Sequence, residues 1–579
     1  MKLTGGAIVV RALEDEGIPF TFGIPGTHNI ELYDALAESR TVRAVLVTDE
    51  QSASFAADGV WRASGRLACV NVVPGAGLTH ALSGIAEAFL DNVPMLVLGC
   101  GIRRDTGRAY QLHDMDQQAL ARPVTKAQML VESGKDLYPV IRGACRIARE
   151  GVPGPVFVEV AANMYLFRHE VELPASPESG REGRASAVPA PEDAPALARA
   201  AELLNGARQP LLYLGLGAAG AGDHLVRLAE RLEAPVATTF QGKGVFPESH
   251  PLALWPGFGD AAPPFARAVA QGCDATLAVG CRFGEVATGS YGVAPPQPLV
   301  HLDIDPAVPG RNFPTAATLT GDAAVLVPAL LDRLVQRPPD LALRERIAAG
   351  RAEVRAAWEK AAGGERVSPW RLLSSLQAQF GPETIFTSDS GNGTFLAVEM
   401  LALQRPGKLL APVDYSCMGY AVPAAIGAKL GRPECPVVAL AGDGAFLMTG
   451  LELLTAAHLG AAVAVFVLRD RELAQIAQFQ SVALNRKTLS ELPDFDVAPL
   501  AAALGVECLR LDRDADIPAV LQRVAEVTLA GRPVVVDTAI DYTEKTWFTR
   551  GVVRTTLGRL PWPDRVRFVA RALARKLTG

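Results

Sequence analysis

Two aspartates that follow apolar, strand-like segments could share a divalent cation. Asp443 stands between two glycines directly after PVVAL (436–440), and Asp470, 27 residues further on, follows AAVAVFVL (461–468). Consecutive strands of a parallel sheet end at the same edge, so the two carboxylates can face one crevice and bind Mg²⁺ through oxygen. The backbone carbonyl of Glu472 is the predicted third ligand from the protein.

The turn around Asp443 could also bind phosphate. Gly442, Gly444 and Ala445 place backbone amides at the end of a strand, and the helix that follows favours an anion at its first turn. The triplet alone is a weak signal, because a plain turn explains most such triplets. The spacing to Asp470 makes a phosphate-bound cation the stronger prediction.

Glu50, His28 and His113 are candidate groups for proton transfer. Glu50 follows the strand-like RAVLVTD (43–49) and begins an apolar helix. An acid at that position is more often stabilised by the helix dipole alone, but an apolar pocket would suit it for proton exchange with a bound ligand. Histidine titrates near neutrality, yet a lone loop histidine is more often structural, and that interpretation is favoured for both.

These residues require an α/β fold to position them. Short β-branched segments alternate with helical patterns through almost the whole chain, which predicts doubly wound parallel sheets with helices on both faces. Changes in this pattern predict three such domains, a linker rich in Pro and Ser, and a basic tail. The predicted domains are 1–171, 195–340 and 366–545, with the linker at 172–194 and the tail at 546–579.

The tail differs in composition from the rest of the chain. It holds eight Lys or Arg and one acid, Asp564. Val566, Val569, Leu573 and Leu577 fall on one face of a predicted helix. A solvated helix docked on the body is the favoured interpretation, and a lid or a grip on an anionic ligand is the alternative.

Composition and charge exclude several classes of function. A hydrophobic fraction of 49% and a net charge of −6 give an ordinary globular protein with no basic excess for nucleic acid. No uncharged apolar stretch reaches the ~20 residues of a membrane helix. The eight cysteines form no C-x-x-C pair, so a zinc site is not expected. Their scatter along the chain favours buried thiols in a reducing compartment. A signal peptide has an apolar run near its N-terminus, whereas residues 14–16 of this chain are acidic. A cytoplasmic protein is therefore expected.

Taken in order, the motifs resemble those of thiamine-diphosphate-dependent enzymes, and of acetolactate synthases in particular. The GDG triplet and its later polar residue resemble the family's diphosphate motif, although Arg469-Asp470 stands where Asn-Asn is usual. The segment 48–59 is similar to the one around the family's essential glutamate. By this resemblance Glu50 would hydrogen-bond the cofactor's pyrimidine ring and promote removal of the thiazolium proton. The three domains would then be pyrimidine-binding, central and diphosphate-binding.

The resemblance also implies contacts to the cofactor and the substrate from several loops. The glutamate and the diphosphate site come from different subunits in this family, which implies a homodimer or a homotetramer. Gln111 would point into the site. The further residues implied for the cofactor are Pro25, Gly26, Pro74, Gly75, Thr79, Gly391, Asn392, Gly393, Ser416 and Met418, and those for the substrate are Thr27, Arg282, Ile476 and Phe479.

The implied reaction is decarboxylation of a pyruvate-like 2-keto acid followed by carboligation to a second keto acid. By the resemblance, Arg282 matches an arginine that binds the carboxylate of the second keto acid. An ion pair with a neighbouring carboxylate, or a contact with a flavin, is an equally good interpretation of this arginine. Phe479 stands where biosynthetic enzymes have Trp, while the segment 283–285 departs from their pattern. A 2-keto acid decarboxylase, an aldehyde lyase or a 2-hydroxyacyl-CoA lyase is the alternative on this fold, and a non-catalytic relative is more remote. A dinucleotide-dependent dehydrogenase is disfavoured, because no G-x-G-x-x-G begins a helix.

A flavin in the central domain is left open but is not favoured. Gly215-Leu216-Gly217 and Asp303-Ile304-Asp305 resemble places that contact FAD in biosynthetic relatives. They are also ordinary turns of a doubly wound sheet, which is the preferred interpretation.

Overall fold

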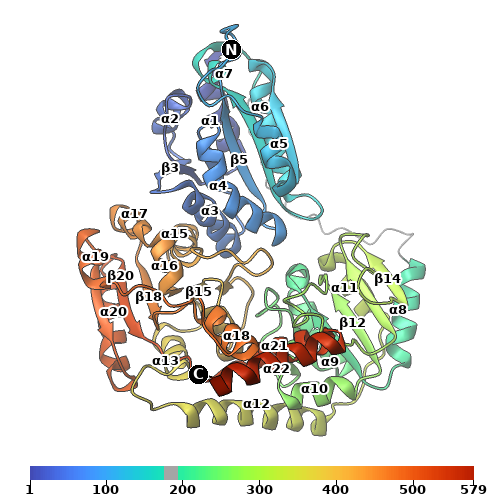
Figure 1. Cartoon of the computed structure of the whole chain (residues 1–579). Coiled ribbons are helices and arrows are strands. Elements are labelled where there is room, and N and C mark those ends of the chain that lie inside the picture. The colour runs from blue at the N-terminus through green and yellow to red at the C-terminus, as the bar shows by residue number, and fades with distance from the viewer. Residues whose placement is uncertain (175–193, 579) are drawn as a thin grey trace.

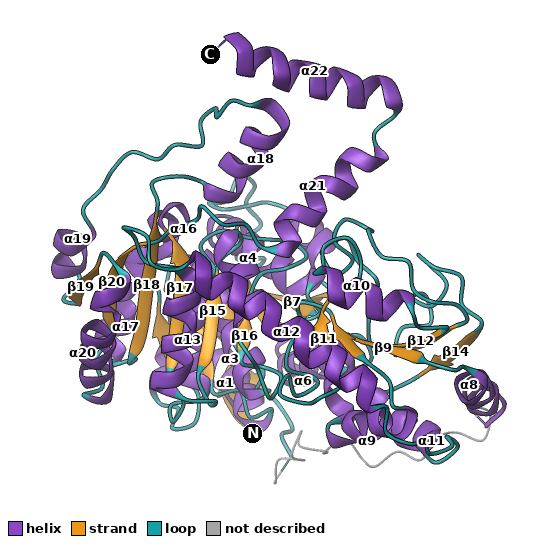
Figure 2. Ribbon diagram, turned by 90° about the horizontal axis from the view of Figure 1, so that it is seen from below, coloured by secondary structure: helices purple, strands orange, loops and turns teal. Residues whose placement is uncertain are grey.

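Three six-stranded parallel sheets, each flanked by helices, make up the computed structural model, which describes residues 1–174 and 194–578 (Figures 1 and 2). The predicted α/β class with three doubly wound domains is confirmed. The predicted linker at 172–194 lies almost wholly outside the described residues, and Ala194 already begins a helix.

The N-terminal sheet has strongly apolar central strands, as expected for strands buried on both faces. Every residue of β4 (Cys69–Val72) and β5 (Met95–Gly101) is buried. A short antiparallel pair, β1 (Lys2–Thr4) with β8 (Arg168–Glu170), joins the two ends of this domain. In sheet order the strands are β3 (Arg43–Leu46), β2 (Phe20–Gly23), β4 (Cys69–Val72), β5 (Met95–Gly101), β7 (Pro155–Ala161) and β6 (Ala127–Val131), and the helices are α1 (Gly5–Asp15), α2 (Ile30–Ala37), α3 (Glu50–Ser64), α4 (Ala76–Leu90), α5 (Gln117–Ala121), α6 (Leu137–Arg149) and α7 (Ala162–Leu166).

The central sheet packs its own apolar core and leads into the long helix α12 (Leu341–Ala361), which runs along the central and third domains (Figure 1). Its strands, in sheet order, are β11 (Ala253–Pro256), β10 (Val236–Thr238), β9 (Pro210–Leu214), β12 (Ala275–Val279), β13 (Leu299–Asp303) and β14 (Ala317–Thr320), with helices α8 (Ala194–Gly206), α9 (Asp223–Leu232), α10 (Pro264–Gln271), α11 (Ala323–Leu331) and α12 (Leu341–Ala361).

The third sheet is built from strands β16 (Leu409–Leu410), β15 (Ile385–Ser388), β17 (Val437–Gly442), β18 (Val463–Arg469), β20 (Val534–Ala539) and β19 (Glu507–Leu511), in that order. Its helices are α13 (Pro369–Phe380), α14 (Asn392–Met400), α15 (Ala421–Gly431), α16 (Asp443–Thr449), α17 (Leu453–Leu459), α18 (Ala474–Leu484), α19 (Val497–Ala503) and α20 (Ile517–Leu529).

The N-terminal and third sheets share one topology. With strands numbered in chain order within each domain, both run 2-1-3-4-6-5, whereas the central sheet runs 3-2-1-4-5-6. In sheets of this kind ligands bind at the carboxyl ends of the strands, where the strand order reverses. The predicted loops after β2 and β4 therefore correspond to those after β15 and β17.

Helices α3 and α15 pack closely and join the N-terminal domain to the third (Figure 1). A Cβ on Gly59 would lie 2.2 Å from the Ala424 carbonyl oxygen, so glycine permits this approach. Beside it, buried Arg62 forms ion pairs of 2.7 Å with Asp58 and 2.8 Å with Asp91. This cluster lies within the N-terminal domain and reaches the third domain through Asp91, which accepts hydrogen bonds from the amides of Val413 (3.4 Å) and Asp414 (3.1 Å).

The tail forms two helices, α21 (Trp547–Arg559) and α22 (Trp562–Thr578). The Arg575 guanidinium donates to the Leu484 carbonyl at the end of α18 (3.0 Å). The apolar face of α22 is directed to solvent, since Val566, Val569 and Leu573 are about half exposed. No helix among residues 1–174 and 194–578 is long and apolar enough to cross a bilayer.

Candidate functional site

Asp443 and Asp470 lie at neighbouring strand ends. β17 and β18 are adjacent and parallel, with Gly442 opposite Leu468, and Asp443 and Asp470 are the first residues after the two strands. Asp443 accepts hydrogen bonds of 2.8 Å from the amides of Gly444 and Arg471. The structure thus brings together the two carboxylates that the spacing predicts to be close.

The charges around this pair fit a divalent cation. Burial and the nearby charge of Asp443 raise the pKa of Asp470 to about 7, and burial also raises the pKa of Asp443. Two carboxylates that disfavour each other's charge and offer hard oxygen ligands suit Mg²⁺. The Glu472 side chain pairs with Lys487, which leaves its backbone carbonyl as the predicted ligand.

Arg469, which replaces the usual asparagine, is explained by its partners. Its guanidinium forms two hydrogen bonds with Asp537 on the adjacent strand β20, at 2.8 and 2.7 Å, and a 3.3 Å ion pair with Asp494. Arg469 is therefore bound by Asp537 and Asp494, and the side chain that lies beside Asp443 is that of Asp470.

A second turn of the third domain has the features of a phosphate cradle. Gly391, at φ 131°, precedes α14, which begins with the buried Asn392, and Gly393 follows in its first turn. The buried Ser388 Oγ and Asp389 Oδ2 have no hydrogen-bond partner among the residues that the structure describes. Orphaned polar groups at a strand's carboxyl end point to a bound ligand.

The remaining predicted residues of this half lie around the two turns. Ser416, in the left-handed region at φ 67°, shares a 2.7 Å hydrogen bond with Ser390. A Cβ on Gly444 would lie 3.5 Å from the methyl group of Met418, while nothing lies within 4 Å of one on Gly442. The open backbone at Gly442 can approach a diphosphate closely, and Ala445 is buried in the first turn of α16 that follows. These residues fit the diphosphate, Mg²⁺ and ring of the implied cofactor.

In the N-terminal domain, Glu50 is the first residue of α3 and is buried. A Cβ on Gly77 would come within 3.0 Å of Glu50 Oε1, so glycine leaves the carboxyl group room beside α4. Asp49 caps the helix by accepting from the Gln51 amide (2.8 Å). The imidazole of His80 lies 3.5 Å from Glu50 Oε2. A buried, positioned acid of this kind suits proton exchange with a ligand.

The turns next to Glu50 are held by side chains that sequence reasoning missed. Gln117 accepts from the Gly75 amide (3.2 Å) and donates to the Cys100 carbonyl, which fixes the Pro74-Gly75 turn. Asn29 accepts from the Gly26 amide (2.7 Å), next to the exposed Pro25. Thr79 is exposed on α4. Both side chains could have been found from the sequence, because Gln117 begins a helix and Asn29 directly precedes one, each just after a loop.

His28 and His113 come together from separate loops. Their rings are 5.3 Å apart and nearly perpendicular, and Thr27 lies 3.2 Å from His28. Burial, with a smaller contribution from His113, lowers the pKa of His28. Gln111 is half-buried two residues before His113. The sequence did not predict this pair.

The predicted substrate residues of α18 lie at the diphosphate half. A Cβ on Gly391 would be 3.9 Å from the Gln475 side chain, which places the first turn of α18 at this loop. Ile476 is exposed and Phe479 half-buried on the same helix. They are available to a substrate that enters from this side.

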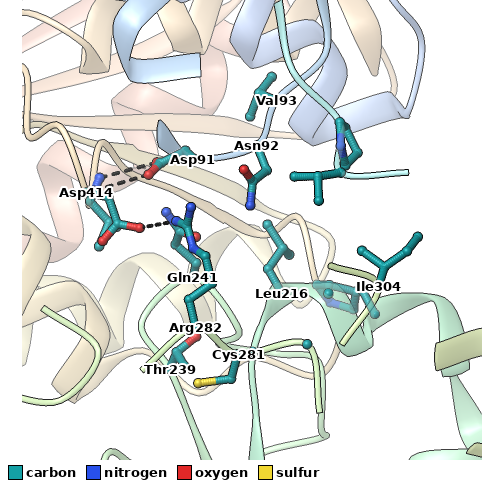
Figure 3. Close-up of a pocket in the computed structure, with 18 of the residues that line it drawn as sticks. Asp91, Asn92, Val93, Leu216, Thr239, Gln241, Cys281, Arg282, Ile304 and Asp414 are labelled. Atoms are coloured by element: carbon teal, nitrogen blue, oxygen red, sulfur yellow. Dashed lines mark hydrogen bonds and ion pairs between the residues drawn. The ribbon is translucent and has the colours of Figure 1, made fainter. Parts of the chain in front are cut away.

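Arg282 takes part in a different arrangement. Its guanidinium donates to Asp414 (2.5 Å) and to the Leu90 carbonyl (2.7 Å), and it lines a cavity of about 550 Å³ (Figure 3). None of its described contacts is with Glu50 or Asp443. The cavity opens at the ends of β9 and β12, where the strand order reverses, and its walls include the turns at 215–217 and 303–305.

Comparison with known proteins identifies relatives across nearly the whole chain. Three models match: "Thiamine pyrophosphate enzyme, N-terminal TPP binding domain" over residues 3–120, its central domain over 197–330, and its C-terminal TPP binding domain over 389–538. An acetolactate synthase of Mycobacterium bovis is 31% identical over 94% of this chain and 89% of its own. A probable acetolactate synthase large subunit of Methanocaldococcus jannaschii is 30% identical over 94% and 93%, and a probable 2-ketoarginine decarboxylase of Pseudomonas aeruginosa is 34% identical over 89% and 90%.

Proposed function

The chain belongs to the thiamine pyrophosphate enzymes and carries out thiamine-diphosphate-dependent chemistry on 2-keto acids, and from that premise we propose that it joins two such acids with loss of carbon dioxide, as an acetolactate synthase does. One observation carries the proposal. Buried Glu50 lies at the carboxyl ends of the strands of one sheet, and buried Asp443 with half-buried Asp470 lies at the carboxyl ends of the strands of a second sheet that has the same topology.

Each half of the site has a distinct task in this proposal. Asp443, Asp470 and the Glu472 carbonyl would hold Mg²⁺ and with it the diphosphate, and Met418 would support the rings. Glu50 donates a hydrogen bond to the pyrimidine and takes its proton back in each cycle. When bound between these groups, thiamine diphosphate would provide the nucleophilic carbon and the electron sink for loss of carbon dioxide.

The fate of the remaining acyl unit separates two candidate functions. The acetolactate synthases that match 94% of the chain favour transfer to a second keto acid. The adjacent His28 and His113 favour a decarboxylase, because a histidine pair can protonate the acyl unit and release an aldehyde. The relative named as a 2-ketoarginine decarboxylase supports this second candidate. Aldehyde lyase and 2-hydroxyacyl-CoA lyase activities remain the further alternatives on the fold.

Product analysis distinguishes the two candidates. Purified protein with thiamine diphosphate and Mg²⁺ is mixed with pyruvate and, separately, with longer and guanidino-bearing 2-keto acids. Carbon dioxide with acetolactate, which yields acetoin on acid treatment, supports carboligation. Carbon dioxide with free aldehyde alone rejects carboligation in favour of the decarboxylase.

The histidine pair gives a prediction on the same assay. If the enzyme releases aldehyde, His113→Phe is expected to lower the release about 100-fold at unchanged cofactor affinity, since a positioned acid contributes about 10²–10⁴-fold. For a carboligase the same change is expected to alter turnover less than about threefold. His224→Phe on α9, which contacts Arg227, is the matched control.

We further propose that the site is completed by a second copy of the chain, in a homodimer or homotetramer. Leu447, Met448, Leu451 and Leu454 form an apolar patch from α16 to α17, right after Asp443, and are 49% to 57% exposed. Large apolar side chains gathered in this way mark an interaction surface. The patch flanks the diphosphate half, so a partner seated on it could bring its own Glu50.

The patch predicts the outcome of one substitution. Leu451→Glu is expected to convert the oligomer to a monomer and to lower activity more than about 10-fold, because a carboxylate buried in an apolar contact is costly. Light scattering after size exclusion, together with the carbon dioxide assay, measures both. Leu529→Glu on α20, 87% exposed, is the control. An active monomer would refute the shared site.

The central cavity is compatible with the flavin alternative that the sequence left open. Its size lies in the range of ligand pockets, and the 3-2-1-4-5-6 order of its sheet is one that binds dinucleotides. The visible absorbance of the purified protein tests for bound FAD. We also propose a cytoplasmic location, in keeping with eight cysteines that are all free thiols.

A further inference from the structure

Helix α4 of the N-terminal domain contacts the loop that leads to Met418 in the third domain. Ser83, Glu87 and Asp91 are spaced by four residues and so lie on one side of the helix and its end. The Ser83 carbonyl accepts from Cys417 Sγ (3.4 Å), and Glu87 Oε2 accepts from the Cys417 amide (3.0 Å). Asp91 holds the same loop through the two amides described above. This side of α4 therefore determines where the residue before Met418 lies, and no role above includes Glu87.

Glu87 is a buried acid that stays neutral. The residue is fully buried, and its Oε1 receives no hydrogen bond from the residues that the structure describes. Burial, followed by the nearby charge of Asp91, raises the pKa of Glu87 to about 9. Arg62 favours the charged form, but its effect is smaller, and it already pairs with Asp58 and Asp91. A protonated carboxyl group still offers an oxygen to the Cys417 amide, so the contact needs no charge on Glu87.

The loop is anchored on both sides of Met418. After Met418, the carboxyl group of Asp389 accepts from the amides of Tyr420 (2.6 Å) and Ala421 (3.1 Å), so this end is held within the third domain. Before Met418, the contact with Glu87 ties the loop to a different domain. The side chain between the two anchors reaches the GDG turn, where a Cβ added to the second glycine would lie 3.5 Å from its methyl group. The position of Met418 therefore depends on α4 as well as on its own domain, through contacts that all lie within one chain.

We propose that Glu87 is a positioning residue that holds Met418 in place beneath the rings of the bound cofactor. The inference rests on the proposed function, in which Met418 supports those rings. Without an acceptor, the Cys417 amide would have to turn towards another partner, because an unpaired buried amide is costly. The loop would then shift, and a displacement of about 1 Å in a positioned group can lower a rate by about 10²-fold. Glu87 acts through Met418 in this role and exchanges no proton itself.

Hydrogen exchange in the protein without cofactor tests the anchor itself. Glu87→Met keeps the approximate size of the side chain but removes the acceptor, so deuterium uptake by the backbone amides of residues 413–421 is expected to become at least about 10-fold faster. Mass spectrometry of peptides from this segment measures the uptake. Glu87→Gln is expected to match the wild type, because its amide oxygen replaces the oxygen of the neutral acid. The matched control is Glu399→Met, which removes an acid that accepts from the Trp547 amide (2.8 Å) at the start of α21.

A double-mutant cycle tests whether Glu87 acts through Met418. The rate at which the C2 proton of bound thiamine diphosphate exchanges with deuterium is followed by rapid quench and NMR. In the holoenzyme, Glu87→Met is expected to slow this exchange about 10-fold or more for each bound cofactor. In a Met418→Ala background the same change is expected to slow it by less than about twofold, since the support that Glu87 holds is already missing. Glu87→Gln and Glu399→Met are expected to stay within about twofold of the wild type.

Any of four results would overturn the proposal: unchanged deuterium uptake at 413–421 in Glu87→Met, C2 exchange in that variant within about twofold of the wild type, an equally large loss of exchange in the Met418→Ala background, or a loss in Glu87→Gln as large as in Glu87→Met. If Glu87→Met fails to fold, Glu87→Asp, whose carboxyl group is withdrawn from the Cys417 amide by one methylene, takes its place in both measurements. Failure of the proposed function looks different. The wild-type holoenzyme itself would then exchange its C2 proton no faster than free cofactor, while the uptake at 413–421 would still respond to Glu87→Met.

Discussion

Glu50→Gln is expected to lower the rate of carbon dioxide release by about 10²–10⁴-fold, the usual contribution of a positioned acid or base. Glutamine keeps the size and one hydrogen bond of the side chain but can neither give nor take the proton. Cofactor binding should change little, since the diphosphate and Mg²⁺ are held by the third domain. Turnover at saturating cofactor, with affinity measured by tryptophan fluorescence, separates the two effects.

Glu31→Gln is the matched control, because Glu31 is likewise an acid in the first turn of an N-terminal helix, α2. Turnover of Glu50→Gln within about twofold of the wild type would contradict the account. Glu50 would then be an acid that stabilises the start of its helix through the dipole and nothing more.

The second large effect is expected at the cation site. Asp443→Ala should weaken the affinity for thiamine diphosphate and Mg²⁺ by about 100-fold or more, because even groups one step removed from a metal contribute about 10–100-fold. It should also abolish the rise in melting temperature that the two ligands give the wild type by mass action. Fluorescence titration and thermal unfolding measure these changes.

Asp470 provides the internal comparison. Asp470→Asn keeps a carbonyl oxygen and is expected to retain cofactor binding, whereas Asp470→Ala is expected to lose it as Asp443→Ala does. Asp512→Ala, which removes an exposed ion pair with Arg510, controls for a general loss of acid. Equal affinity in Asp443→Ala and wild type would show that the aspartate pair holds no cation.

Much of the fold and of the diphosphate half could be predicted from the sequence, because local signals specify them. The alternation of β-branched and helical segments fixes the α/β class, and the glycines around Asp443 mark a strand end. The distance to Asp470 matches one βα unit, so the two strands become neighbours in a parallel sheet. Sequence spacing translates directly into space only for such consecutive units.

Contacts between distant segments could not be predicted. Arg282 meets Asp414, 132 residues away, and its ion pair depends on how the central and third domains face each other. His80 meets Asp49 because two helices begin at the same edge, and His28 meets His113 because two loops converge. Each pair follows from tertiary packing, on which a single sequence carries no periodic signal.

The C-terminal tail shows a further limit of prediction from hydrophobic periodicity. The apolar positions 566, 569 and 573 lie on one helical face as predicted, yet that face is directed to solvent while Arg575 contacts α18. Periodicity identifies which residues share a face, but not which face meets the body.

The central claim is that Glu50 and the aspartate pair together activate thiamine diphosphate, and the C2–H exchange rate of the bound cofactor tests it most directly because no substrate has to be known. We expect the wild-type enzyme with Mg²⁺ to exchange this proton orders of magnitude faster than free cofactor does, and Glu50→Gln to lose most of that acceleration. Exchange at the rate of free cofactor in the fully loaded wild-type enzyme would contradict the account.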